Sequence, residues 1–321
     1  LAGFTVLRPP YEAACQQSAQ KQLNLKEDFT EARITMTTAP EQNNFVDVIA
    51  KRIQQDDIEV PMLPEVANKV MRLTNDPESC AADLAKLIQS DQTLAGHVMR
   101  IANSALYSPN ATLVSLQQAI TRLGMRVIGE IALAACVNGK MFNAPGYEKH
   151  IQTELQFSLM AGLWAKEVAR ACRRNVEAAF LAGLLHDIGR PVCVQVVNEV
   201  AKAFRIEVTP NQMYELEEHF QRSLGISVVH QWEMPSLVCD VVTWFDDYAN
   251  AGKSAEQTMI VVAGAEFARR FYKGTPLRQK ITHDQLIKSP VLGELNLYPD
   301  DIEKLVEKEE LITAAMEAMS Q

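Results

Sequence analysis

The amino-acid sequence predicts an essentially all-α fold, and three observations support this. From Phe45 onward, apolar residues recur three and four positions apart, as they do along one face of a helix. No segment alternates between apolar and polar residues for more than about four positions, as a half-buried strand would. The connections are short and contain the Asn, Asp, Gly and Pro residues that form turns. Short helices joined in this way are typical of a compact bundle whose neighbouring helices pack antiparallel.

Residues 1–44 differ from the rest of the chain. They are rich in Gln, Thr, Ala and Pro, and only 4–7 and 33–36 resemble strand segments. The sequence also starts with Leu instead of Met. We therefore expect 1–44 to be an N-terminal extension, or a linker from a preceding module.

Residues 45–145 are expected to form a first helical lobe. Asp91 and Ser115 each precede an apolar-periodic segment, where an acceptor side chain caps the free N–H groups of a helix. Gly124 then ends the helix that Ser115 begins. The helices expected in this lobe are 45–53, 65–73, one that carries Leu84, Leu87 and Ile88, one from Asp91 that carries Leu94, Val98 and Ile101, 116–123 and 125–137.

Residues 146–275 are expected to form a second helical lobe, and 276–321 a C-terminal helical extension. Gly189 predicts the end of the helix before it, because Gly adopts the left-handed cap and the following Pro191 interrupts the hydrogen-bond ladder. Gly225 likewise separates two predicted helices. The helices expected here are 147–173, 176–188, 192–204, 213–220, 226–232, 237–248, 254–272 and 301–319, the last of them amphipathic and acidic.

Composition and charge argue against several classes of function. The 321 residues carry 31 Lys and Arg against 40 Asp and Glu, a formal net charge of −9, whereas a nucleic-acid binder needs a basic face. The six cysteines are scattered without a CxxC pair, which indicates free thiols in a reducing compartment and no structural zinc site. No uninterrupted apolar run of about 18 residues could span a membrane. We expect a cytoplasmic protein that binds neither nucleic acid nor membrane.

An adjacent pair, His186 and Asp187, lies inside the apolar segment VEAAFLAGLLHDIGRP. The apolar residues around the pair recur at helical spacing, which predicts that the segment is buried. Burying an imidazole and a carboxylate without partners costs about 1–3 kcal/mol for each unsatisfied group. Either a metal ion or other side chains must therefore compensate the pair.

Several motifs occur in a fixed order along the chain. They are LPEV at 63–66, the segment 83–91 leading into 94–104, SLQQAITRLG at 115–124 and AFLAGLLHDIG at 179–189. Together, over 60–270, they resemble the HDOD domain, the signalling-output relative of the bacterial HD phosphohydrolases. The resemblance implies an all-helical N-terminal lobe followed by an HD-like helical lobe, and it does not extend to 1–44 or to the C-terminal end.

The resemblance also implies a metal site, which an active HD enzyme builds from a His on an earlier helix, the His-Asp pair and an Asp on a later helix. A hydrolytic Fe, Mn or Zn site needs at least three protein ligands and an open position for water. In this sequence, Phe157 stands at the place of the first His and Glu266 at that of the late Asp. We predict no catalytic residue, and a vestigial or weak metal site at His186, Asp187 and Glu266.

No other His is a convincing replacement for the missing one. Relatives often have His at position 221 and within 244–248, where this sequence has Gln221 and Trp-Phe-Asp-Asp-Tyr. His150 lies two helical turns, or about 10 Å, before Phe157. His219 is turned to roughly the opposite side of its helix from Gln221.

Two functions remain open at this point. The first is a non-catalytic signalling domain that binds a protein partner or an upstream sensory module and needs no cofactor, its His-Asp pair held by side chains such as Glu266, Arg269 or Arg270. The alternative is a phosphohydrolase that uses Fe, Mn or Zn and acts on a nucleotide or cyclic dinucleotide. A receptor that binds a cyclic dinucleotide without hydrolysis would need an arginine-lined pocket, for which Arg170, Arg173 and Arg269 are available.

Overall fold

The computed structural model describes residues 40–55, 57–76, 78–104, 107–108, 112–137, 141–274 and 279–320. Every regular element within these residues is a helix, and they contain no strand. The all-α prediction is therefore confirmed. The strand-like segments 4–7 and 33–36 lie outside the described residues.

The first lobe contains five helices. They are α3 (Glu65–Asn75), α4 (Ala81–Gln89), α5 (Gln92–Ala102), α6 (Leu116–Leu123) and α7 (Met125–Val137). Both predicted N-caps are confirmed, because Asp91 accepts a hydrogen bond from the backbone N–H of Leu94 at 3.0 Å and Ser115 accepts one from that of Gln118 at 3.2 Å. Gly124 ends α6 with φ of 87°, a conformation that favours glycine.

The second lobe is built around one long central helix. Its helices are α8 (Glu148–Ala171), α9 (Val176–Leu185), α10 (Gly189–Phe204), α11 (Pro210–Gln231), α12 (Ser236–Trp244) and α13 (Ala255–Phe271), with short 3₁₀ turns at Phe245–Asn250 and Gly252–Ser254. The central helix α8 packs closely against α9 and α13. A Cβ at Gly183 would lie only 2.6 Å from the Cα of Gly162, so α8 and α9 touch backbone to backbone.

Two of the predicted helix boundaries in this lobe are wrong, and both involve a glycine at a helix crossing. Gly189 does not end a helix; α9 ends at Leu185 and Gly189 is the first residue of α10. Gly225 does not separate two helices, because α11 is continuous through it. At the crossing of α10 and α11, a Cβ on Gly189 would lie 1.8 Å from the carbonyl oxygen of Gln221. Both glycines permit this close approach instead of a turn.

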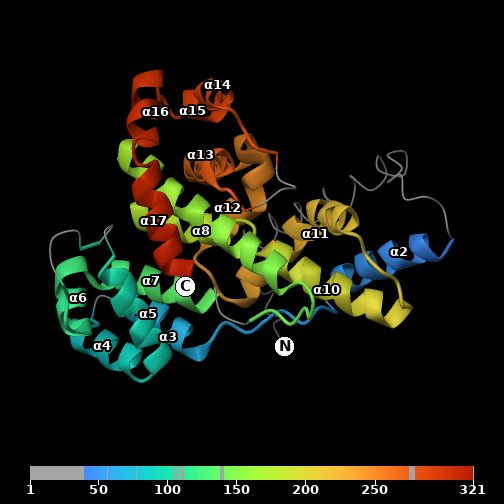
Figure 1. Cartoon of the computed structure of the whole chain (residues 1–321), viewed down its shortest axis with the longest axis horizontal. Helices are drawn as coiled ribbons and strands as arrows, with labels where there is room; N and C mark the ends of the chain where they lie inside the picture. Colours follow the sequence, from blue (N-terminus) through green and yellow to red (C-terminus); the bar gives the residue numbers. More distant parts are fainter. Residues whose placement is uncertain are drawn as a thin grey trace, which may run out of the picture.

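The C-terminal extension joins the two lobes. It contains α14 (His283–Ile287), α15 (Pro290–Glu294), α16 (Pro299–Val306) and α17 (Glu309–Ser320). The single helix predicted at 301–319 is wrong, because the chain turns at Glu307 and Lys308 between α16 and α17. This turn lets α16 pack on α8 while α17 reaches α5 and α7 of the first lobe as well as α8 (Figure 1).

The helix that precedes both lobes in the chain packs against the second lobe. This helix, α2 (Pro40–Gln54), begins earlier than the sequence predicts and contacts α10 and α11 (Figure 1). Its buried residues Phe45 and Ile49 join the same continuous apolar core as the buried residues of both lobes. The predicted helix 45–53 therefore packs with helices of the second lobe.

One helical stretch has the length and hydropathy of a membrane span. It covers Val176–Phe204, and 94% of its most apolar window is buried inside the protein. Such burial is the environment of a core segment, as expected for α9 and α10 at the centre of the second lobe.

Candidate functional site

The His-Asp pair lies in the tight turn between α9 and α10. His186 and Asp187 are 1% and 4% exposed. The Nδ1 atom of His186 lies 2.7 Å from the carbonyl oxygen of Gly183, so Nδ1 carries the proton and donates it to this oxygen. The rings of Phe157 and Phe245 lie beside the imidazole in tilted arrangements, and their centroids are 6.2 and 4.7 Å from that of the imidazole. The other ring nitrogen, Nε2, is 3.4 Å from Oδ2 of Asp187.

Two buried arginines neutralise the Asp187 carboxylate. Nε of Arg190 lies 3.4 Å from Oδ2, and Nη2 of Arg222 lies 3.9 Å from Oδ1. Arg222 also donates hydrogen bonds to the backbone carbonyls of His186 at 2.8 Å and Val242 at 3.0 Å. Its outer side pairs with the exposed Asp246 at 2.8 Å. Arg222 therefore ties the α9–α10 turn to α11 and α12.

Glu266 does not complete a metal-ligand set with the pair. It lies on α13, 3.9 Å from Arg269 on the same helix, and burial raises the pKa of its carboxyl. Among the described residues, His186, Asp187 and Glu266 are not a group whose ligand atoms all lie within 4.8 Å of one another. With the arginines already on Asp187, these three residues do not fit a metal ion as they stand. A vestigial or weak site at this place stays a prediction.

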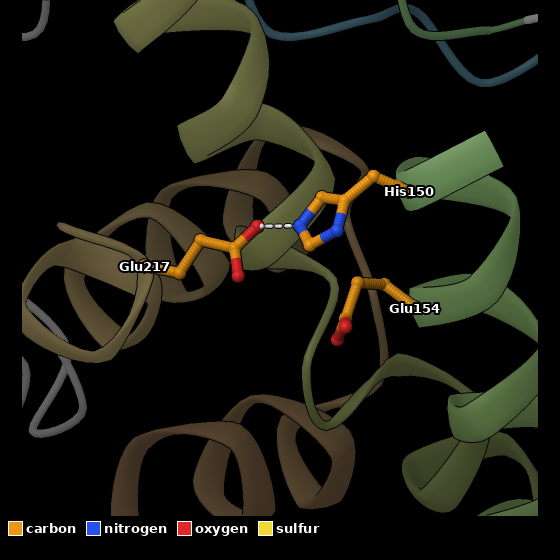
Figure 2. Close-up of side chains that lie close together, drawn as sticks. All are labelled: His150, Glu154 and Glu217. Atoms are coloured by element: carbon orange, nitrogen blue, oxygen red, sulfur yellow. Dashed lines mark hydrogen bonds and ion pairs between the residues drawn. The ribbon is translucent and has the colours of Figure 1, made fainter. Parts of the chain in front are cut away.

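A second polar cluster lies nearby, between α8 and α11. His150 and Glu154 project from α8, four residues apart and therefore on one face, and Glu217 projects toward them from α11 (Figure 2). Nε2 of His150 donates a hydrogen bond of 2.6 Å to Oε1 of Glu217. One ligand atom from each of the three residues lies within 4.8 Å of the other two. Both glutamates are buried, whereas the His150 side chain is 26% exposed.

Both His150 and Glu217 hold a proton more tightly in this second cluster than the free side chains do. The hydrogen bond to Glu217 raises the pKa of His150, and burial raises the pKa of Glu217. Arg190 lies 3.8 Å from Glu154 and 3.5 Å from Glu217, and it also pairs with Glu218 at the surface. Although burial disfavours the charge on Arg190, the carboxylates of Asp187, Glu154 and Glu218 outweigh it and raise the pKa of the guanidinium. Arg190 thus connects the two clusters.

Glu154 and Glu217 were not predicted as site residues, and His150 was not predicted to replace the missing His. The reason was that His150 lies two turns before Phe157 on α8, and Phe157 stands at the family position of that His. The spacing of His150 and Glu154 was a usable signal, because residues four apart on a helix share a face. No sequence pattern points to Glu217, which lies 67 positions from His150 in the chain.

Of the three arginines suggested for a cyclic dinucleotide, Arg170 lines a pocket that the other two do not line. Arg170 pairs with Glu167 and lines a pocket of about 370 Å³ together with Lys304 and Lys308. Neither Arg173 nor Arg269 lines that pocket. A receptor for such a ligand gains no support from this arrangement.

Solved structures of similar fold come from several bacteria. An HDOD domain protein of unknown function from Geobacter sulfurreducens is 21% identical, with a TM-score of 0.66 over 87% of this chain and 98% of that one. A candidate metal-dependent phosphohydrolase from Shewanella amazonensis SB2B is 20% identical, with a TM-score of 0.65 over 87% and 100%. A candidate signal transduction protein from Marinobacter aquaeolei VT8 is 22% identical, with a TM-score of 0.61 over 90% and 68%. At these identities the likeness shows the fold.

The sequence is also similar to one curated protein and to one family model. An uncharacterized protein of Treponema pallidum (strain Nichols) is 21% identical over 266 residues, which are 80% of this chain and 51% of that protein. The chain thus spans about half the length of this curated relative. The family model of the HDOD domain matches residues 60–248, more than half of the chain. The protein therefore belongs to the HDOD domain family.

Proposed function

We propose that this protein is a non-catalytic HDOD signalling domain that acts by binding a protein partner or a regulatory module. In this proposal the His186–Asp187 pair is a vestigial metal site with a structural role. The observation that supports it best is the neutralisation of Asp187 by two buried guanidiniums, those of Arg190 and Arg222.

A catalytic metal would need lone pairs that face an open position. Each carboxylate oxygen of Asp187 already has an arginine nitrogen within 4 Å, and the imidazole of His186 is covered by Phe157 and Phe245. A hydrolytic site needs at least three protein ligands and room for the attacking water. The side chains around the pair instead satisfy each other, as buried polar groups do in a structural network.

The names of the structural relatives support the signalling role and also its alternative. One of them is named as a candidate signal transduction protein, and another as a candidate metal-dependent phosphohydrolase. The second name keeps the hydrolase as the alternative function, and a direct assay separates the two.

The assay measures phosphate release from a generic diester, bis(p-nitrophenyl) phosphate, and from cyclic dinucleotides, in the presence of Mn²⁺, Fe²⁺ or Zn²⁺. We expect no difference in rate between the natural protein and Asp187→Asn. Metal-dependent turnover that disappears in Asp187→Asn would reject the non-catalytic function and support the hydrolase.

Binding to a protein partner is tested by substitutions at exposed apolar side chains. Met62 is 86% exposed and Val114 is 77% exposed. Once a partner has been found by pull-down, we expect Met62→Glu or Val114→Glu to weaken binding, whereas the exposed polar substitution Lys69→Gln serves as the control. A partner that binds all three variants equally well would place the binding surface elsewhere on the protein.

A further inference from the structure

We propose that His150, Glu154 and Glu217 form a binding site for a divalent transition metal ion, Zn²⁺ or Mn²⁺, separate from the His-Asp pair. This proposal goes beyond the signalling function and does not depend on it. It assigns the ion a structural role between α8 and α11, with no part in a reaction.

The residue types and their geometry suit such an ion. An imidazole nitrogen and carboxylate oxygens are ordinary ligands of Zn²⁺ and Mn²⁺. His150 and Glu154 share one face of α8, and Glu217 faces them from α11 (Figure 2). Neighbouring ligands of a metal at about 2.1 Å are about 3.0–3.4 Å apart. The contact of 2.6 Å between Nε2 of His150 and Oε1 of Glu217 therefore has to open by less than an ångström.

One carboxylate oxygen of the cluster, Oε2 of Glu217, lacks a hydrogen-bond partner. Glu217 is 0% exposed, and its Oε2 atom accepts no hydrogen bond. The nearest cation in the described residues is Nη1 of Arg190 at 3.5 Å, which itself donates no hydrogen bond. A buried carboxylate oxygen without a hydrogen bond destabilises the folded protein, and a bound metal ion would supply the missing partner.

The charges also leave room for a further cation. Arg190 is within 4 Å of Glu154, Glu217 and Asp187, so one guanidinium is shared among three buried carboxylates. Asp187 also has Arg222 within 4 Å. Once an ion binds Glu154 and Glu217, Arg190 keeps its pairs with Asp187 and Glu218 and stays neutralised.

An ion can reach the cluster from the side of His150. The two glutamates are buried, but the His150 side chain is 26% exposed. The cluster therefore reaches solvent at the His150 imidazole, which is the ligand that an entering ion would meet first.

The test measures metal binding by the full chain after it has been purified without a His tag and stripped with chelator. Zn²⁺ and Mn²⁺ are titrated separately at pH 7.5 by calorimetry, and the bound metal is counted by elemental analysis after dialysis. We expect one equivalent of at least one ion and a rise in Tm on its addition. His150→Ala and Glu154→Gln should each weaken binding by at least about 100-fold and abolish the rise in Tm.

Two control variants distinguish this site from other places. His283→Ala removes a surface His that pairs with Glu303, and it should leave binding unchanged. Asp187→Asn should also retain the metal. Binding that is lost in Asp187→Asn but kept in Glu154→Gln would overturn the proposal and place the ion at the His-Asp pair. Absence of binding by both ions in the folded natural protein would overturn it as well.

Discussion

The two polar clusters on either side of Arg190 neutralise their carboxylates in different ways. Asp187 has a guanidinium near each oxygen, and its neighbour His186 donates to a backbone carbonyl and is 1% exposed. Glu154 and Glu217 share Arg190 with Asp187, and their own cluster contains the partly exposed His150. The first arrangement is that of a closed structural network, whereas the second leaves a carboxylate oxygen without a hydrogen bond. A family motif and a metal-binding geometry can therefore lie in different places.

The largest loss of stability is expected when Arg222 is removed from the first cluster. Arg222→Met takes a cation from Asp187 and a donor from the carbonyls of His186 and Val242. We expect the free energy of unfolding to fall by about 3–5 kcal/mol, because a buried charge and buried acceptors lose their partner. Urea denaturation measures this loss.

The same variant shows whether a metal can replace the arginine. We expect added Zn²⁺ or Mn²⁺ to stabilise Arg222→Met no more than it stabilises the natural protein, since in the described part of the chain His186 and Asp187 belong to no group of three possible ligands. A clearly larger gain in the variant, lost in the double variant Arg222→Met/Asp187→Asn, would show that the His-Asp pair binds metal and that the two clusters do not differ in this respect.

The next largest effect is expected at the helix crossing that positions both clusters. Arg190 lies on α10, whereas Glu217 and Arg222 lie on α11. In Gly189→Ala the new Cβ would meet the carbonyl oxygen of Gln221 at 1.8 Å, so the two helices must separate. We expect a loss of about 3 kcal/mol in the free energy of unfolding, again by urea denaturation.

A matched glycine provides the control for this prediction. Gly293 lies in the short helix α15, and a Cβ there would meet nothing within 4 Å. Gly293→Ala should be neutral or stabilising by about 0.5–1 kcal/mol, because Ala restricts the unfolded chain and favours the helix. Equal losses in the two variants would mean that Gly189 is not a contact residue.

These glycines show which parts of the structure the sequence predicts. Local chemistry predicted the caps at Asp91 and Ser115 and the end of α6 at Gly124, because each depends on residues within one turn. Gly189 and Gly225 were predicted to end helices. Glycine occurs both in turns and where two helices pack closely, and the sequence alone does not distinguish the two cases.

In the candidate site, too, local sequence patterns predict one part and contacts between distant helices determine the other. Burial of His186 and Asp187 follows from the apolar segment around them, and the structure confirms it. The roles of Arg190 and Arg222 depend on how α10 packs against α11, and no local sequence pattern predicts this packing. Glu217 joins His150 only through the contact of two distant helices. Tertiary packing therefore determines the part of the site that the motif does not contain.

A fourth buried carboxylate, that of Glu130, differs from the other three because it pairs with a lysine instead of an arginine. Oε2 of Glu130 on α7 accepts a hydrogen bond of 2.6 Å from Nζ of Lys166 on α8. Burial outweighs this lysine and raises the pKa of Glu130 from 4.5 to about 6. Since the folded state holds the proton more tightly, the contribution to stability is present below pH 4.5 and is lost as the pH rises to about 6.

This pH dependence is measurable by substitution. Over that window the free energy of unfolding of the natural protein should fall by about 2 kcal/mol relative to Glu130→Gln, which has no proton to lose at this position. Urea denaturation of both proteins between pH 4.5 and 6.5 gives the two slopes. Parallel pH profiles would show that Lys166 fully compensates the buried charge.

The smallest effect is expected where the network reaches solvent. Asp246 pairs with Arg222 at 2.8 Å, but its side chain is 63% exposed, whereas Asp187 on the inner side of the same arginine is 4% exposed. Water and salt screen an exposed pair, so Asp246→Asn should lower the free energy of unfolding by only about 0.5 kcal/mol, and less at high salt. Asp187→Asn should cost several times more, because it leaves two buried guanidiniums short of a counter-charge. Urea denaturation at low and high NaCl compares the two variants, and equal losses would mean that burial does not determine which acid Arg222 needs.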